Sequence, residues 1–268
     1  MQEINIEEKK SLSLEILQQI SSFCNTNNIK YFLDYGTLLG CIRHNGFIPW
    51  DDDIDICMLR NDYEKFKSIF SSNDLSLISF ETKGVYPLPF IKISDNRTEG
   101  VIYDKFKLNY GVAIDIFPID DYPNNKIIRS LFFKIQDILM SLYGIALFGV
   151  YYKEMTLTTF IKKIFSKICS PSRICYLINK NAKIFNSDKA KYAGCVSEIT
   201  KHKMEICLKE SRKKQILHSF EKNEFYIPQG WDDVLTSIYG DDYMTPPPEG
   251  KRISTHVEAY YWKADIND

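Results

Sequence analysis

Aspartates crowded beside apolar residues are the feature of this sequence that points most directly to chemistry. Residues 51–58 read DDDIDICM, so that Asp51, Asp53 and Asp55 occupy alternate positions in front of an apolar run. Carboxylates held this close repel one another and resist joint ionisation unless a cation lies between them. If the segment is a strand, these three carboxylates point to one side while the isoleucines pack inward. Such oxygen ligands suit Mg²⁺ or Mn²⁺ shared with a substrate phosphate, and that is the chemistry we expect here.

A further aspartate, Asp115, stands inside the apolar segment VAIDIFPID, residues 112–120. A lone charge in so apolar a strand is costly unless something pairs with it. If the two strands lie side by side, Asp53, Asp55 and Asp115 form a centre whose cations clamp the oxygens of a phosphoryl displacement. Asp115 could instead be the base that takes the proton of an acceptor hydroxyl. Three other aspartates are expected to be solvated loop residues: Asp52, Asp120 and Asp121.

The elements that must position these residues alternate between helix and strand. An amphipathic helix is predicted over 7–24, where apolar residues recur at helical spacing. Short β-rich segments predict strands over 29–35, 75–81, 89–95 and 110–120. Pro118 is expected to stop the last strand. A short helix is expected to begin near Gly36 or Thr37, where free backbone N–H groups could approach a phosphate. The pattern predicts a mixed α/β (α+β) core.

The charge of the chain is unevenly distributed, although its net value is only −1. Residues 126–191 hold 12 Lys and Arg against 3 Asp and Glu, whereas the rest of the chain holds 22 against 32. The same region is helical in pattern, so we expect a basic helical insertion over 124–195 within a single domain of residues 1–268. A basic unit of this kind favours an anionic partner.

Composition and targeting signals limit the classes of protein to which this chain can belong. With 44% hydrophobic and 26% charged residues, the chain is neither disordered nor collagen-like. Its seven cysteines are scattered and contain no CxxC pair, which argues against disulfides and structural zinc and indicates a reducing cytosol. The N-terminal residues lack the apolar core of a secretory signal. The most apolar stretch, 138–152, is shorter than the roughly 20 residues of a spanning helix, so no membrane span is expected.

Four segments together resemble the LicD family of phosphocholine transferases. They read YGTLLGCIRHNGFIPWDDDIDICM, FIKISD, AIDIFPID and YGDDYMTPPPEGKRISTH and follow one another in the order of that family's blocks. The resemblance implies a nucleotidyltransferase-like mixed sheet core with flanking helices. It also implies that Asp53, Asp55 and Asp115 hold the metal and a nucleotide triphosphate or diphosphate, and the strand alternation adds Asp51 as a further metal ligand.

The resemblance also implies a reaction. A phosphoalkyl group, phosphocholine in the first place, passes from a CDP-alcohol such as CDP-choline to a hydroxyl of a cell-surface glycan, and CMP leaves. The acceptor would be teichoic acid, lipopolysaccharide, capsule or a lipid-linked glycan precursor, and no nucleic acid partner is expected. Three alternatives stay open: CDP-glycerol or CDP-ribitol as donor, as in the related fukutin group; a true nucleotidyltransferase; and a non-catalytic glycan- or nucleotide-binding module.

Several polar and aromatic residues are candidates for binding the donor or the acceptor. Arg43 and His44, at the end of the short helix, could contact donor phosphate or only cap that helix. Trp50 could stack on cytosine or choline, or pack inside the protein. The predicted donor-binding residues are Gly36, Thr37, Arg43, His44, Trp50 and Lys92. After the three prolines 246–248, a lid or a plain surface loop is expected to carry Lys251, Arg252 and His256.

The basic insertion acquires a role if the acceptor is lipid-linked. The segment FIKKIFSKIC, residues 160–169, sets Lys162, Lys163 and Lys167 opposite an apolar face. A helix of this kind binds the anionic inner leaflet of a membrane. We therefore expect a cytoplasmic protein with peripheral contact at the inner face of the cell membrane, the alternative being a lobe with a solvated basic face.

Overall fold

The structure is a computed structural model that describes residues 2–82, 87–102, 106–108, 110–148, 164, 170–197, 207–252 and 258–263. The strands are β1 Phe32–Leu33, β2 Asp55–Leu59, β3 Leu75–Ile78, β4 Ile91–Asp95, β5 Thr98–Ile102, β6 Phe106–Leu108, β7 Ala113–Tyr122, β8 Tyr192–Cys195, β9 Cys207–Leu208, β10 Gln215–Phe220, β11 Asn223–Pro228 and β12 Glu258–Trp262. The helices are α1 Ile6–Thr26, α2 Tyr35–His44, α3 Arg60–Ile69, α4 Lys126–Phe148, α6 Pro171–Ala182 and α7 Trp231–Tyr239, with short 3₁₀ turns η1 Lys183–Phe185, η2 Lys209–Arg212 and η3 Glu249–Lys251.

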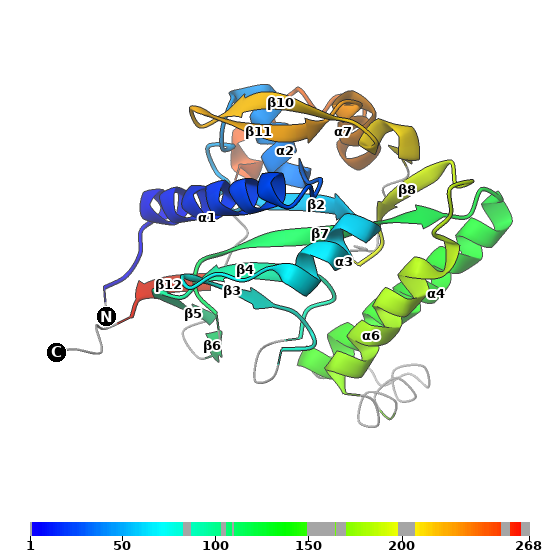
Figure 1. The fold of residues 1–268 in the computed structure, drawn as a ribbon, viewed down its shortest axis with the longest axis horizontal. Coiled ribbons are helices and arrows are strands. Elements are labelled where there is room, and N and C mark those ends of the chain that lie inside the picture. Colours follow the sequence, from blue (N-terminus) through cyan, green and yellow to red (C-terminus); the bar gives the residue numbers. More distant parts are fainter. Residues whose placement is uncertain are drawn as a thin grey trace.

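A mixed β-sheet forms the centre of the molecule (Figure 1). Its strand order is β1-β2-β7-β4-β3, and β8 pairs with β7 and β9 with β8. Strands β2 and β7 run parallel, whereas β4 runs antiparallel to β7. A hairpin of β10 and β11 and a three-stranded sheet β12-β5-β6 complete the described strands. The predicted mixed sheet with flanking helices is confirmed.

The two faces of the central sheet follow the predicted alternation along β2 and β7. Ile54, Ile56, Ile114 and Ile116 are fully buried in one large core with apolar side chains of α1 and α3. The next residues along the strands, such as Phe117, belong to a separate cluster on the opposite face. Figure 1 shows α1 and α3 lying along the sheet. The odd-numbered aspartates of these strands therefore point away from the main core.

Helix starts explain how the first elements are fixed. At α1 the Asn5 side chain accepts the N–H groups of Glu7 and Glu8, while the Glu8 carboxylate accepts the Asn5 N–H. This capping box begins the helix predicted over 7–24. Helix α2 begins at Tyr35 with Asp34 as N-cap, slightly before the predicted start at Gly36 or Thr37. Tyr35 has a φ of 44°, so a bulky residue adopts the left-handed conformation at the turn from β1 into α2.

The prediction that Pro118 stops its strand is wrong, because β7 continues to Tyr122. On the side of β7 away from β2, the pairing with β4 ends at Ile116 and the pairing with β8 begins at Ile119. Pro118 lies in the gap between these two partners, where the missing N–H leaves no ladder bond unmade.

Helices α4 and α6 lie side by side at one edge of the molecule (Figure 1). Leu142 of α4 packs against Ile174 and Ile178 of α6, so the region is helical as predicted over 126–148 and 171–182. Strand β8 pairs with β7, so the chain returns to the central sheet before the predicted end at residue 195. The predicted basic segment, with Lys162, Lys163 and Lys167, lies outside the described residues, apart from the helical Ile164.

Among the described residues one helix, α4, is long and apolar enough to cross a membrane by length and composition. The qualifying stretch is Lys126–Leu147, with a mean hydropathy of 1.3. The length of the stretch 138–152 was a wrong argument against a membrane span, because residues 138–148 of that stretch belong to a helix that begins 12 residues earlier, at Lys126. Core helices of other proteins meet the same criteria, so composition alone does not decide where α4 lies.

Candidate active site

Three neighbouring strands bring two carboxylates and an ammonium group into one row across the central sheet. Asp55 on β2 is the register partner of Asp115 on β7, and Asp115 is the register partner of Lys92 on β4. The Asp115 N–H donates to the carbonyl of Ile54 at 3.0 Å, which fixes the two strands to each other. Lys92 Nζ donates to Asp115 Oδ1 at 2.5 Å. The predicted convergence of Asp55 and Asp115 is therefore a direct consequence of parallel pairing.

Lys92 is held in its charged form. Burial by itself lowers the pKa of Lys92, but the charges of Asp115 and Asp55 outweigh burial and raise the pKa above its usual value. The ammonium also lies 5.8 Å from the ring centre of Phe90 and 5.6 Å from that of Tyr110. Lys92 thus points into the carboxylate row and not into bulk solvent, and aromatic faces surround it.

The first turn of α2 positions the aspartate segment. Thr37 Oγ1 accepts the Asp55 N–H at 2.8 Å, and the Asp34 N–H donates to the Asp55 carbonyl at 3.0 Å. A Cβ placed on Gly36 would lie 2.6 Å from Asp51 Oδ2, so only glycine allows this carboxylate to approach the helix. Gly36 and Thr37 therefore contact the predicted metal ligands, whereas their predicted contact with a donor phosphate stays a prediction.

Three neighbouring aspartates are not solvated, contrary to the prediction. Asp52 is buried and accepts from Lys9 Nζ at 2.9 Å. Asp120 and Asp121 are buried too, because β7 carries them into the protein. Their partners are Arg60, whose Nε donates to Asp120 at 2.8 Å, and Lys209, whose Nζ donates to Asp121 at 2.8 Å. These carboxylates join elements to one another and are committed to internal ion pairs.

A second group of predicted residues gathers at the other end of α2. The ring centres of His44 and Trp50 lie 6.2 Å apart, and the Arg252 guanidinium carbon lies 5.4 Å from the Trp50 ring centre. Arg43 Nη1 donates to the Tyr243 carbonyl at 2.8 Å. Burial and then the charge of Arg43 lower the pKa of His44, so its imidazole is neutral near pH 7. The tail segment thus lies against α2, and its role as a lid stays a prediction. Lys251 is exposed, and His256 lies outside the described residues.

Tyr239, at the end of α7, is a site residue that the sequence analysis missed. Burial and then the charges of Asp55, Asp34, Asp51 and Asp53 raise its pKa. Burial lowers the pKa of Arg43, and Tyr239 opposes that shift. The phenol therefore lies within electrostatic reach of both the aspartates and the basic group. The only signal in the sequence was its place in the YGDDY segment of the last family block.

The predicted metal centre is only partly assembled. Among the residues that the structure describes, no group of three or more His, Cys, Asp or Glu side chains is close enough to hold a metal ion as it stands. Asp55 and Asp115 are adjacent, but Lys92 takes one Asp115 oxygen. The carboxylate oxygens are the donors that Mg²⁺ and Mn²⁺ prefer, so the chemistry of the donor set fits the predicted cation.

Comparisons with known proteins identify the family of this chain. Residues 28–140 match the family described as LicD/FKTN/FKRP, nucleotidyltransferase domain. The chain is 31% identical to the lipopolysaccharide cholinephosphotransferase LicD of Haemophilus influenzae, over 97% of this chain and 99% of that relative. The chain belongs to the LicD family. An uncharacterized protein of Rickettsia typhi is 29% identical over 44% of this chain and 41% of its own length. The predicted family resemblance is confirmed.

In this LicD family member, a buried ion pair that the sequence analysis missed stabilises the turn next to the aspartates. Arg212 Nη1 donates to Asp34 Oδ2 at 2.9 Å and Nη2 donates to Asp34 Oδ1 at 3.2 Å, with both side chains fully buried. Arg212 also donates to Cys57 Sγ at 3.0 Å. Since Asp34 caps α2 and binds Asp55, Arg212 fixes the turn that carries the aspartates. No local pattern pairs residues 178 positions apart.

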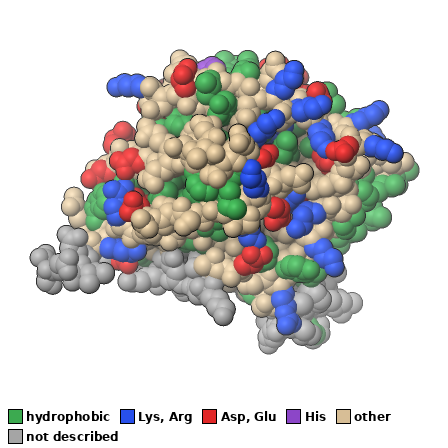
Figure 2. Space-filling model, in the orientation of Figure 1, with side chains coloured by type: hydrophobic (Ala, Val, Ile, Leu, Met, Phe, Trp, Pro, Cys, Tyr) green, Lys and Arg blue, Asp and Glu red, His purple; other side chains and the backbone are tan. Residues whose placement is uncertain are grey.

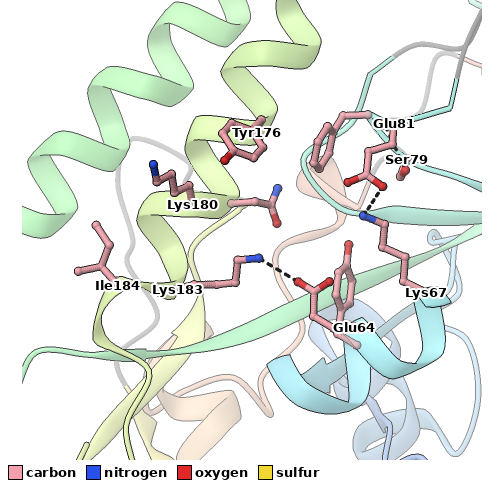
Figure 3. Close-up of a pocket in the computed structure, with 11 residues that line it drawn as sticks. Glu64, Lys67, Ser79, Glu81, Tyr176, Lys180, Lys183 and Ile184 are labelled. Carbon is pink, nitrogen blue, oxygen red and sulfur yellow. Dashed lines mark hydrogen bonds and ion pairs between the residues drawn. The ribbon is translucent and has the colours of Figure 1, made fainter.

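A separate pocket of about 360 Å³ opens between α3, α6 and the segment that follows β3 (Figure 3). Two ion pairs cross it, Lys67 with Glu81 at 2.6 Å and Lys183 with Glu64 at 3.2 Å. None of the predicted site residues of this LicD family member lines the pocket. The pocket is therefore distinct from the carboxylate row.

Proposed function

We propose that this chain transfers phosphocholine from CDP-choline to a hydroxyl of a lipopolysaccharide glycan, releasing CMP, with Mg²⁺ or Mn²⁺ as cofactor. The observation that carries the proposal is the side-by-side placement of Asp55 and Asp115, next to Lys92. The chain that holds them matches a lipopolysaccharide cholinephosphotransferase over 97% of its length. In the reaction the acceptor oxygen attacks the phosphorus that bears choline. The bond from that phosphorus to the bridging oxygen breaks, and CMP leaves with the electron pair.

Each residue of the row has a role in this chemistry. Asp55 and Asp115, with Asp51 and Asp53 from the preceding segment, would hold the cation, which offsets charge on the phosphoryl oxygens. Lys92 pairs with Asp115 and would add positive charge beside the diphosphate. A carboxylate oxygen of the row that is not bound to the cation would accept the proton of the acceptor hydroxyl. Arg43 and Arg252, at the other end of α2, would bind a second anionic part of the donor.

Aromatic side chains beside the row support choline as the transferred alcohol. The half-buried rings of Tyr35 and Phe90 pack against Phe117, with ring centres 5.2 Å and 4.6 Å apart. Phe90 already lies near a cation, the Lys92 ammonium. Aromatic faces attract quaternary ammonium groups in the same way. Glycerol and ribitol carry no such charge and would gain nothing from these rings.

The test is turnover of the purified chain with CDP-choline, Mg²⁺ and lipopolysaccharide lacking phosphocholine. We expect CMP release matched by choline incorporation, and loss of both when EDTA removes the cation. Asp115→Asn should lower kcat by at least about 100-fold, since it removes a charge aimed at the reacting phosphate. Asp74→Asn, at an exposed aspartate, is the matched control and should leave kcat unchanged.

Other outcomes separate the alternatives. CMP release with CDP-glycerol or CDP-ribitol, and none with CDP-choline, would keep the chemistry but replace the alcohol. Pyrophosphate release from CTP would indicate a nucleotidyltransferase, and binding of CDP-choline without turnover a non-catalytic module. Full turnover by Asp115→Asn would remove the basis of the proposal.

A further inference from the structure

Helix α4 exposes a stripe of large apolar side chains. Fourteen large hydrophobic side chains are exposed among the described residues, and five of them lie on this one helix. Their exposed fractions are 81% for Ile127, 47% for Ile128, 60% for Leu131, 43% for Ile135 and 54% for Ile138. Apart from the adjacent Ile127 and Ile128, these positions recur every three or four residues, so the five lie along one side of the helix. Figure 2 shows hydrophobic side chains along the edge of the molecule where Figure 1 places α4. A contiguous patch of this kind marks an interaction surface.

The other side of α4 is fixed to the body of the protein. Phe132 and Phe133 are buried against Tyr122 at the end of β7. Gln136 is fully buried, and its Nε2 donates to the Ile178 carbonyl at 3.4 Å and to the Val196 carbonyl at 3.1 Å. A helix that crossed a bilayer would have to leave these partners and expose the amide to hydrocarbon, which is costly. With only 28% of its most apolar window buried, α4 is instead held along the surface with its stripe outward.

The dimensions of the stripe fit insertion parallel to a surface. From Ile127 to Ile138 the helix rises about 16 Å, which is roughly half the hydrocarbon thickness of a bilayer. Interfacial helices bury an apolar face about 5–10 Å deep at the boundary of headgroups and acyl chains. One row of isoleucine and leucine side chains is suited to that depth and too short to span.

Charge decides between a lipid surface and a second copy of the chain. Residues 126–191, which include α4, carry 12 basic and 3 acidic residues. Two copies meeting through α4 would bring these like-charged regions together, whereas an anionic bilayer attracts them. Lys126 and Lys134, both exposed on α4, lie next to Ile127 and Ile135 in the chain, within reach of headgroup phosphates.

We propose that the α4 stripe docks this protein on the surface of an anionic lipid bilayer, with its apolar side chains in the headgroup region and Lys126 and Lys134 on lipid phosphates. The residues involved are distinct from the carboxylate row, and lipid binding can be measured without any transfer activity. Its failure would therefore leave the proposed function untouched, and failure of that function would leave the docking surface untouched.

The experiment is flotation of the full chain with vesicles of phosphatidylethanolamine and phosphatidylglycerol, compared with phosphatidylcholine vesicles. The stripe variant is Ile127→Ser/Leu131→Ser/Ile135→Ser, all at exposed positions. The matched control changes three exposed apolar residues on other elements, Ile69→Ser/Leu217→Ser/Met244→Ser. Wild type and control should float with the anionic vesicles, while the stripe variant should bind at least tenfold less. Lys126→Gln/Lys134→Gln should weaken binding to anionic vesicles several-fold and leave any binding to phosphatidylcholine unchanged.

Three results would overturn the proposal. The first is wild type that stays at the bottom of the gradient with both vesicle types. The second is a stripe variant that floats as well as the control. The third is a dimer in lipid-free solution, seen by light scattering, that the stripe variant converts to monomer, since a second copy would then cover the face. Matching thermal unfolding curves for the stripe variant and wild type establish that any lost binding comes from the surface.

Discussion

Removing Arg212 should destabilise the protein strongly, because it leaves the Asp34 carboxylate charged and buried without its cation. Both side chains are fully buried and joined by two hydrogen bonds of 2.9 Å and 3.2 Å. Arg212→Met keeps most of the volume of the side chain while removing its charge and all its donors. The Asp34 N–H still donates to Asp55, so the disturbance passes directly to the carboxylate row.

The expected magnitude follows from the burial of the pair. Removing one partner of a buried ion pair costs about 3–5 kcal/mol. Domains are stable by about 5–15 kcal/mol in total, so the variant would lose a large share of its stability. In a chain of this size each kcal/mol shifts Tm by about 2–4 °C, which predicts a fall of about 6–20 °C. Changing Asp34→Asn in the same chain removes the stranded charge and should recover at least about 1 kcal/mol.

Urea unfolding followed by circular dichroism measures the free energies of unfolding for the single and double variants. Lys213→Met is the matched control, because Lys213 is the next residue and its pair with Glu210 is exposed on both sides. Such a pair contributes less than about 0.5 kcal/mol. The reasoning is refuted if Arg212→Met unfolds within about 1 kcal/mol of wild type, or if the double variant is no more stable than the single one.

Three further predictions concern the site and the core. Thr37→Val removes the acceptor of the Asp55 N–H in nearly the same volume. It should cost about 1–3 kcal/mol of unfolding free energy and lower kcat, and unchanged values of both would contradict the positioning role. Phe90→Leu should raise KM for CDP-choline several-fold and leave KM for CDP-glycerol, if that donor is used, unchanged; equal effects on both would argue against a choline site. Burial raises the pKa of four groups to about 12: Cys24, Cys41, Cys175 and Tyr31. The unfolded chain releases these protons from about pH 9 while the folded chain retains them, so the free energy of unfolding should be unaffected by these groups below pH 9 and fall as pH rises through 12. Native thiols that react with iodoacetamide at pH 8 as fast as unfolded ones would show that this burial is wrong.

The sequence was sufficient to predict which faces of the two strands are apolar and which carry the aspartates, because that alternation is local. Alternation along 112–117 and 53–58 placed the isoleucines inward and the aspartates outward, and the structure confirms both faces. The pairing of Asp55 with Asp115 needed one further assumption, that the two apolar strands are neighbours. The predicted start of α2 was one or two residues too late, because the N-cap residue is Asp34. The Asp34 side chain makes no capping hydrogen bond and pairs instead with Arg212, which is distant in the sequence.

What the sequence did not predict depends on residues far apart in the chain. Asp52, Asp120 and Asp121 resemble surface aspartates until Lys9, Arg60 and Lys209 are brought beside them. The prediction ended the strand at Pro118, because no local sequence pattern shows that β7 changes its pairing partner from β4 to β8 at this residue. The helix α4 was read as too short because its first turns, rich in exposed isoleucine, were not recognised as continuous with the apolar stretch after residue 138.

The contacts that position the aspartate segment all come from one element, the turn from β1 into α2. Asp34 binds Asp55 through its backbone, Thr37 binds the same residue through its side chain, and Gly36 admits Asp51. Three residues of this turn thus hold the like-charged segment, while Lys92 of β4 supplies an ion-pair partner to the row. These hydrogen bonds run to the backbone of Asp55 and not to its carboxylate, so they fix the segment without neutralising its charge, as the proposed cation site requires. Tyr35, in the same turn, adopts the left-handed conformation, which is a conformational cost of that arrangement.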